Sequence, residues 1–495
     1  MSDVCLVLEG TYPYVTGGVS SWVHHYIRSL SHVRFALMVI LPTRGFYQDY
    51  KYDIPNNVDS ITEIYIHDSD LSHQRHINNP IQAFETIKSY YTSLDEHRFE
   101  DFNKVFKDVL DPSTRKISTY DLFYSYKSWE ALQEMYQSLA SNESFLDFFW
   151  SIRFAHLPLM KIADAAIPTA KVYHSLSTGF AGFAAVVAHL KTKAPMIITE
   201  HGIYTNERRI ELEHSLWLQS NQKDSHIVEA SENTLQEIWV TLFDHLSRLA
   251  YYYSDHITTL FESNRKMQIT GGANPNKTSI IHNGIDIDRF PYKEHPPRSD
   301  EEGYVVGFVG RVVAIKDIKT MIRAFALVSQ EKENVTFYLF GPTDDEPDYF
   351  DEVLQLVDSL GMSTQVIFPG LVNVQEWYPL IDVIVLTSIS EGQPLVIIEA
   401  NCSGIPCVTT DVGGCSEQLY GTTPDDIAIG PSGLVTAISD PQDTADCILK
   451  ILNDDDLRIR MGVSGRERIL KYYTQSNMNY DYYKLYQDHM IYEGL

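Results

Sequence analysis

Short apolar runs alternate with longer amphipathic segments along most of the chain. The first run, residues 4–10 (VCLVLEG), leads into a glycine-containing loop. Residues 20–30 follow, and their apolar positions recur at helical spacing behind a serine cap. Similar short apolar runs occur at residues 35–41, 171–176, 194–199 and 256–260. Strands that alternate with helices in this way predict a parallel sheet with crossover helices.

A second series of the same kind follows a Pro- and charge-rich stretch at residues 291–303 (PYKEHPPRSDEEG), which we interpret as an interdomain linker. Its strands are predicted at YVVGFVG, VTFYLFG, QVIFPG, DVIVLTS and IPCVTTD. The chain is therefore expected to be an α/β protein with two doubly wound halves. Ligands of such sheets bind beyond the carboxyl ends of the strands.

Residues from about 68 to 150 break this alternation, because they are rich in aromatic residues and helical in period. We predict a helical insertion in the first domain, and favour a packing subdomain over a surface that docks a partner. The expected domains are residues 1–290 with this insertion, the linker 291–303, residues 304–470, and a C-terminal helix at 471–495.

The charge balance excludes some classes of partner. The 495 residues hold 39 Lys and Arg against 66 Asp and Glu, a net charge of -27. The negative net charge disfavours binding to nucleic acid or to an anionic bilayer over a broad surface. A phosphate ligand therefore needs a local cationic pocket. The five cysteines show no metal or disulfide spacing, which suits a reducing compartment. No signal-peptide pattern or segment of about 20 apolar residues is found, so we expect a cytoplasmic protein.

The segment TSISEGQPLVIIEANCSG carries the first candidate site. Pro394 is predicted to open a helix that runs to about Gly404, with Glu391 before it and Glu399 inside it. The free N–H groups and the dipole of the helix favour an anion such as a pyrophosphate. Glu399 could accept two hydrogen bonds from a vicinal diol such as a ribose. The alternative stays open that Glu391 caps the helix and Glu399 is a solvated helix residue.

Two further patterns could meet a phosphate. Arg311 and Lys316 lie five residues apart between a predicted strand and a predicted helix. Two fixed cations there could stabilise the charge on a departing phosphate, although they could also be surface cations. Gly17 and Gly18 precede a helix and permit close backbone approach, although a plain tight turn has the same pattern. The glycine spacing is not GxGxxG, which weakens a dehydrogenase interpretation.

A metal site is not expected. The two Asp-x-Asp strings, Asp68 with Asp70 and Asp286 with Asp288, resemble the metal ligands of other transferases. The first pair precedes the predicted insertion and the second lies near the predicted linker. We interpret both pairs as incidental, with the cations Arg311 and Lys316 in place of the ion.

Several ordered motifs together resemble one family. They are EGxPLxxxEA, GIPCVTTDVGG, GFVGRVVAIKDIKTMIRAF, IIHNGIDIDRF and LEGTYPYVTGGVSSWV. Their order is similar to that of retaining glycosyltransferases of the glycogen-synthase and sucrose-synthase type, family 4. The resemblance covers most of the chain outside the insertion. It implies the GT-B fold, in which two Rossmann-like domains face a cleft and the last helix returns to the first domain.

The resemblance also implies roles for particular residues. It implies a UDP-sugar donor, retention of anomeric configuration, and no metal or other cofactor. The family usually continues Lys-Gly where this chain has Lys316 and Asp317. Implied catalytic residues are Glu391, His201, Arg311 and Lys316, and implied donor-binding residues are Gly17, Gly18, Arg311, Lys316, Gly392, Pro394, Leu395, Val396 and Glu399.

The N-terminal residues 3–27 are similar, more narrowly, to cytoplasmic glycosyltransferases of Pel exopolysaccharide systems. This implies a polysaccharide acceptor and a place beside an inner-membrane export complex, without nucleic acid. Two alternatives remain at this stage. One is a sugar-nucleotide epimerase or a phosphorylase on the same fold, and the other is a non-catalytic, nucleotide-binding component of an export complex.

Overall fold

The computed structural model describes most of the chain, as two compact units. Unit 1 comprises Met1–Thr258, Met267–Ser279 and Tyr483–Leu495, and unit 2 comprises Thr259–Lys266 and Ile280–Tyr482. Asp70 and part of the predicted insertion lie outside the described residues. The described ranges are 1–10, 12–47, 49–68, 80–92, 98–214, 234–294, 296–298 and 302–490.

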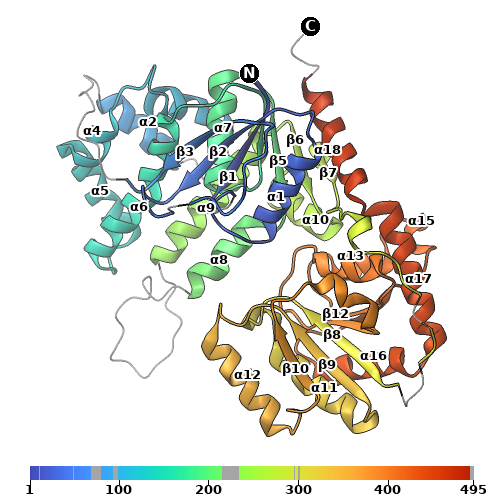
Figure 1. Cartoon of the computed structure of the whole chain (residues 1–495). Helices are drawn as coiled ribbons and strands as arrows, with labels where there is room; N and C mark the ends of the chain where they lie inside the picture. Colours follow the sequence, from blue (N-terminus) through green and yellow to red (C-terminus); the bar gives the residue numbers. More distant parts are fainter. Residues whose placement is uncertain are drawn as a thin grey trace. The chain divides into compact units, whose positions relative to one another are not determined.

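Unit 1 is built on a seven-stranded sheet in the order β3-β2-β1-β4-β5-β6-β7 (Figure 1). The pairings of β1 with β2 and β4, and those of β2 with β3 and β4 with β5, are parallel. Every residue of β2 is buried, as expected for an apolar strand covered on both faces. The first six strands have the Rossmann order. The strands are β1 (Ser2–Glu9), β2 (Phe35–Leu41), β3 (Val58–Tyr65), β4 (Ala170–Ser175), β5 (Met196–Glu200), β6 (His256–Thr259) and β7 (Thr278–Ile280).

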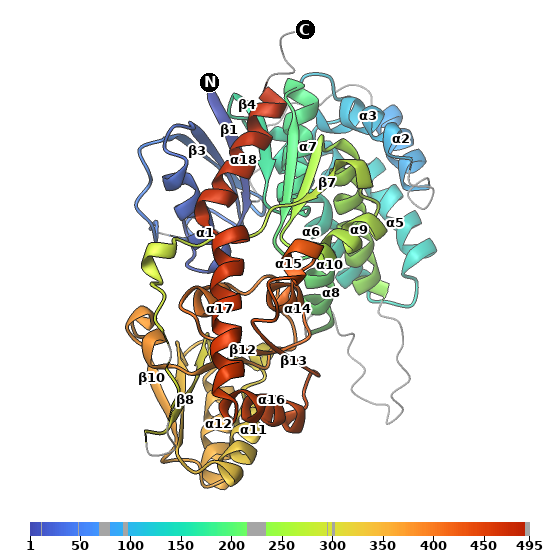
Figure 2. The same cartoon turned by 90° about the vertical axis from the view of Figure 1, so that its right-hand side faces the viewer.

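The helices of unit 1 include a group between β3 and β4, in the region of the expected insertion. In Figures 1 and 2 this blue-green group gathers on one side of the sheet, away from α1. The helix α7 follows β4 and is almost entirely buried against the sheet. The helices are α1 (Gly18–Ser29), α2 (Pro80–Thr92), α3 (Phe102–Val105), α4 (Thr119–Tyr124), α5 (Tyr126–Leu139), α6 (Phe145–Asp164), α7 (Phe180–Thr192), α8 (Tyr204–His214), α9 (Thr234–Tyr253) and α10 (Glu262–Thr270), of which residues 262–266 belong to unit 2.

Unit 2 repeats the topology with six strands in the order β10-β9-β8-β11-β12-β13. All its strand pairings are parallel, so the carboxyl ends of the strands share one edge. The strands are β8 (Tyr304–Val309), β9 (Val335–Phe340), β10 (Val366–Gly370), β11 (Val383–Leu386), β12 (Cys407–Thr410) and β13 (Gly433–Thr436). The helices are α11 (Ile318–Glu331), α12 (Pro347–Ser359), α13 (Leu395–Cys402), α14 (Cys415–Tyr420), α15 (Pro424–Ile427), α16 (Pro441–Leu452), α17 (Asp455–Tyr472) and α18 (Gln475–Met490).

The division of the chain differs from the sequence-based expectation at residues 259–266 and 280–290, which belong to unit 2 rather than to the first domain. The longer of these segments directly precedes the predicted linker. Backbone hydrogen bonds tie this segment to the α17–α18 junction: the Ile285 N–H donates to the Tyr473 carbonyl (3.0 Å), and the Gln475 N–H donates to the Ile285 carbonyl (2.8 Å). The Pro- and charge-rich composition of the predicted linker starts only at residue 291. Composition alone therefore places the domain boundary too far towards the C-terminus.

The end of α18 belongs to unit 1 through a buried polar chain. The Tyr26 hydroxyl donates to the Tyr486 hydroxyl (2.7 Å), which also lies 2.6 Å from Nδ1 of the buried His174. The His174 Nε2 lies 2.8 Å from the Thr199 hydroxyl. Within the described ranges, none of the helices combines the length and the apolar character that crossing a membrane requires.

Candidate functional site

The structure brings Lys316 and Glu391 together at the carboxyl edge of the unit 2 sheet. Lys316 ends a short 3-10 turn after β8, and Glu391 lies in the loop after β11. The Lys316 ammonium donates to Glu391 Oε1 (2.5 Å), and the Ser388 hydroxyl donates to the same oxygen (2.6 Å). The side chains of Lys316 and Glu391 are only 20% and 11% exposed. Two donors, Lys316 and Ser388, therefore fix the Glu391 carboxylate, and both side chains of the ion pair are largely shielded from water.

Asp317 occupies the position where the family usually has glycine. Its backbone is left-handed, with φ 45° and ψ 51°, a region that glycine and Asp enter more readily than most residues. Its carboxylate caps α11 by accepting from the Thr320 N–H (3.2 Å), and it also accepts from the Ser439 hydroxyl (2.9 Å). Asp317 therefore keeps the glycine-like turn that places Lys316, and starts the next helix.

The loop that carries Glu391 is fixed by its neighbours. The Gln393 amide donates to the Leu260 carbonyl (3.0 Å), and its oxygen accepts from the Asn283 N–H (2.7 Å). The Gly414 N–H donates to the Gly392 carbonyl (2.8 Å). A Cβ on Gly413, whose φ is +55°, would lie 2.2 Å from the Glu391 carbonyl oxygen. The loop position thus requires glycine at 413.

We expect Gly413→Ala to destabilise unit 2 by about 2 kcal/mol, because a left-handed alanine costs about 1 kcal/mol and the backbone clash adds to it. Urea unfolding of the full-length chain measures the change. Gly361→Ala is the matched control, since Gly361 has φ +70° but open space around an added Cβ. Equal losses in the two variants would show that the contact with the Glu391 loop is unimportant.

Glu399 lies inside α13, as the sequence predicted, and its carboxylate has one hydrogen-bond donor among the described residues. The Tyr378 hydroxyl donates to Glu399 Oε2 (2.8 Å). Burial raises the pKa of Glu399, while the hydrogen bond from Tyr378 and the charge of Arg289 lower it in part. The carboxylate is therefore neither a bare surface group nor part of a full ion pair.

The start of α13 differs by one residue from the expectation. Pro394 is the cap residue with extended ψ of 121°, and the helix begins at Leu395 and ends at Cys402 rather than at about Gly404. Within the part of the chain that the structure describes, no acceptor is found for the N–H groups of Leu395 and Val396. These two groups can bind an anion, whereas Pro394 has no N–H to offer.

Arg311 does not join Lys316 and Glu391. Its guanidinium pairs with Asp345 (3.1 Å) and its side chain is 61% exposed. The next carboxylate along, Glu346, accepts from the Ala314 N–H (2.8 Å). The expectation that Arg311 and Lys316 converge on one group is thus not met here, because each cation has a carboxylate of its own.

The candidate residues of unit 1 lie around α1. Gly17 and Gly18 are exposed at its N-terminus, and a Cβ on either would meet no atom within 4 Å. His201 directly follows β5, and its ring packs edge-on against Trp22 of α1, with centroids 4.8 Å apart. Burial lowers the pKa of His201 to about 4, so the ring is neutral at pH 7. Its buried Nε2 has no partner among the described residues. His201 therefore keeps one free hydrogen-bonding atom.

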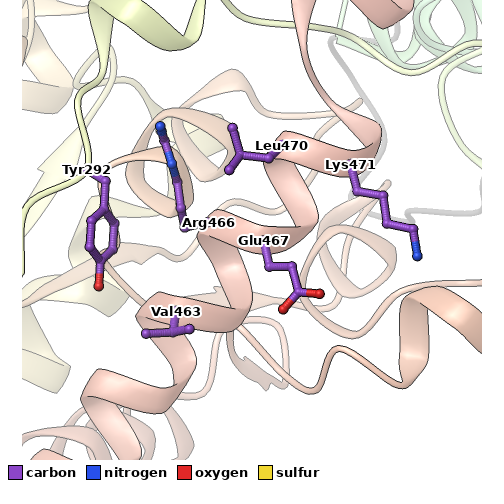
Figure 3. Close-up of a pocket in the computed structure, with 6 residues that line it drawn as sticks. All are labelled: Tyr292, Val463, Arg466, Glu467, Leu470 and Lys471. Atoms are coloured by element: carbon purple, nitrogen blue, oxygen red, sulfur yellow. The ribbon is translucent and has the colours of Figure 1, made fainter.

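Other features of the structure lie apart from these residues. A shallow depression of about 530 Å³ on unit 2 contains no residue predicted for the site (Figure 3). Asp286 accepts from the Asp288 N–H (3.1 Å), so it caps a turn. No cluster of three or more potential metal ligands is found in the described part of the chain. The depression is lined by Tyr292, Val463, Arg466, Glu467, Leu470 and Lys471.

Sequence reasoning missed Ser388, Tyr378, Gly413 and Asp345. Ser388 stands three residues before Glu391 in the quoted motif, so its proximity was available from the sequence. Gly413 belongs to the double glycine that ends the stretch GIPCVTTDVGG. Tyr378 precedes Glu399 by 21 residues, and no spacing rule connects them. Only the fold brings those two side chains together.

Comparison with known proteins identifies the class of the chain. Residues 292–468 match the family described as Glycosyl transferases group 1, so this part is a glycosyltransferase domain. HepE of Anabaena in complex with UDP is similar in structure, with a TM-score of 0.58 and 14% identity over 98% of this chain and 100% of that chain. Sucrose-phosphate synthase from Thermosynechococcus elongatus gives 0.59 and 14%, over 98% of each chain. The chain has the GT-B fold, as predicted.

A longer match defines the family. Residues 2–276, more than half of the chain, match the family described as Domain of unknown function (DUF3492), and the chain belongs to it. Curated relatives include N-acetyl-alpha-D-glucosaminyl L-malate synthase of Bacillus anthracis, 28% identical over 43% of this chain and 55% of the relative. D-inositol 3-phosphate glycosyltransferase of Corynebacterium jeikeium is 31% identical over 42% and 51%. The chain thus spans about half the length of these relatives.

Proposed function

We propose that the chain is a retaining glycosyltransferase that moves a hexose from a UDP-sugar to a growing exopolysaccharide, without a metal ion. The observation that carries this proposal is the shielded Lys316–Glu391 pair beside the open N–H groups of α13. This arrangement lies in the domain that matches Glycosyl transferases group 1. A cation and a helix N-terminus suit a diphosphate, and the acid beside them suits the sugar that the diphosphate carries.

In the proposed reaction the acceptor hydroxyl attacks the anomeric carbon from the face that the phosphate leaves. The bond from that carbon to the β-phosphate oxygen breaks, a bond to the acceptor oxygen forms, and the hydroxyl proton passes to the departing phosphate. Lys316 and the N–H groups of Leu395 and Val396 stabilise the charge on that phosphate. Glu399 holds the ribose. Glu391 and His201 are both proposed to position the hexose.

We propose that Arg311 also binds the donor diphosphate, once its ion pair with Asp345 is broken. Its pair with Asp345 is largely exposed, and exposed pairs contribute little, about 0–1 kcal/mol. A diphosphate, with more negative charge than one carboxylate, can therefore displace Asp345 from Arg311. Gly17 and Gly18 offer open backbone at the start of α1 to the sugar or to the phosphate.

We place the enzyme in the cytoplasm, beside an inner-membrane polysaccharide-export complex of the Pel type. The support is the N-terminal resemblance, together with similarity to the capsular polysaccharide biosynthesis glycosyltransferase CapM of Staphylococcus aureus, 26% identical over 45% of this chain and 59% of the relative. The choice of UDP is supported by the UDP-bound neighbour HepE. The hexose is glucose or an N-acetylhexosamine.

Calorimetric titration of the full-length chain with UDP-glucose, UDP-N-acetylglucosamine, GDP-glucose and ADP-glucose tests the donor. We expect binding of a uridine donor with the highest affinity, and tighter binding of a guanosine or adenosine donor would reject UDP. Release of UDP that requires an oligosaccharide acceptor then distinguishes a transferase. An epimerase would release no UDP, a phosphorylase would require phosphate, and a non-catalytic component would bind the donor without turnover.

A further inference from the structure

The hydroxyl of Tyr378 donates a hydrogen bond to the carboxylate of Glu399. Tyr378 lies in a short 3-10 turn (Tyr378–Leu380) just before β11, is 1% exposed, and packs edge-on against Phe290 with ring centroids 5.9 Å apart. Its ring is thus fixed by burial, and its hydroxyl reaches Glu399 Oε2 at 2.8 Å. A hydrogen bond between a buried hydroxyl and a charged carboxylate is among the stronger kinds.

Besides Tyr378, two ionisable groups of the described residues interact electrostatically with the Glu399 carboxylate. Arg289 acts on it from the segment before the linker, and Cys402 shares its helix. Burial and the Glu399 charge raise the pKa of Tyr378 well above its usual value, so the hydroxyl remains a donor. No donor to Oε1 is found among the described residues. One oxygen is therefore held by the protein, and the other is left for a ligand.

We propose that Tyr378 is a positioning residue of the donor site, which orients the Glu399 carboxylate so that it can accept both hydroxyls of the donor's ribose. This inference rests on the function proposed above. A carboxylate has about four acceptor positions, and Tyr378 uses one of them. The remaining positions on Oε1 and Oε2 suffice for two hydroxyl donors, provided that the carboxyl stays ionised and does not rotate.

The proposal gives Tyr378 an effect that depends on both the ribose and the pH. Without its hydroxyl, Glu399 loses a hydrogen bond that lowers its pKa, and this pKa rises further above the usual value. The carboxyl is then protonated at higher pH than in the parent protein. Affinity for a ribose should fall as the pH falls through the raised pKa, and should recover as the pH rises.

The experiment compares the Kd of UDP and of 2′,3′-dideoxyuridine diphosphate for the full-length chain, by calorimetry from about pH 6 to about pH 9. We expect Tyr378→Phe to weaken UDP binding about tenfold at the low-pH end of this range and less towards its high-pH end, and to leave dideoxy-UDP binding unchanged. Glu399→Gln should weaken UDP binding at every pH. Tyr304→Phe, at another buried tyrosine of unit 2, should change neither.

The outcomes separate the two levels of the proposal. Failure of the parent protein to bind UDP would overturn the proposed function. UDP binding that depends on Glu399 but is the same in Tyr378→Phe as in the parent would overturn only the role of Tyr378. Equal weakening for UDP and dideoxy-UDP would also overturn it, because a structural defect that does not involve the ribose hydroxyls weakens the binding of both ligands alike.

Discussion

Replacing Lys316 by alanine is expected to lower kcat for sugar transfer on the order of 10³-fold, a typical effect of removing one preorganised electrostatic stabiliser. Lys316 is the one cation that contacts Glu391 in the described part of unit 2, and its side chain is 20% exposed. Its charge therefore acts in a poorly solvated position, where it stabilises a developing phosphate charge more than a surface lysine could. The measurement is acceptor-dependent release of UDP at saturating donor.

Lys319→Ala is the control for the Lys316 variant. Lys319 lies three residues further along, at the start of α11, and it pairs with Glu352, whose side chain is 58% exposed. Loss of the Lys319 side chain should leave kcat within about twofold of the parental value, because exposed ion pairs contribute little. The role of Lys316 as phosphate stabiliser would be rejected if both variants kept parental turnover, or if both lost it equally.

The strands that were predicted all lie inside their sheets, except the edge strand β10. β2 was predicted at its observed bounds because all seven of its residues are apolar, and the structure buries all of them. β3 was missed, since it is an edge strand with exposed polar residues such as Asp59 and Ser60. β7 and β13 were missed because they are short strands at the edges of their sheets and are only partly buried. Hydrophobic patterning detects central strands well and edge strands poorly.

The candidate site was predictable where it lies in one motif and unpredictable where it depends on partners far along the chain. The placement of Glu399 within α13 follows from spacing alone. The contact of Lys316 with Glu391, across 75 residues, was expected only at the level of one sheet edge. Tyr378 carried no motif, and Asp345 lies in an acidic stretch that resembles an ordinary solvated loop. The choice of ion-pair partner by Arg311 depends on that loop's conformation.

A second large effect is expected away from the site, at the buried pair of Arg468 and Asp426. Arg468 on α17 is fully buried, and its Nε donates to Asp426 Oδ1 (2.7 Å). Its other nitrogens donate to the carbonyls of Leu419 (2.9 Å) and Gly430 (2.8 Å). The guanidinium therefore joins α14, α15 and α17, and Asp426 supplies its only carboxylate among the described residues.

Asp426→Ala should destabilise unit 2 by about 3 kcal/mol or more, because a buried cation without its counter-charge costs about 3–5 kcal/mol. Urea unfolding of the full-length chain, followed by circular dichroism, measures the loss. Glu352→Ala, which breaks an exposed pair, should cost less than about 1 kcal/mol. Adding Arg468→Met to Asp426→Ala should recover part of the loss, since no unpaired buried charge then remains. A double variant less stable than Asp426→Ala would show instead that the carbonyl contacts of Arg468, and not its charge pairing, hold these helices together.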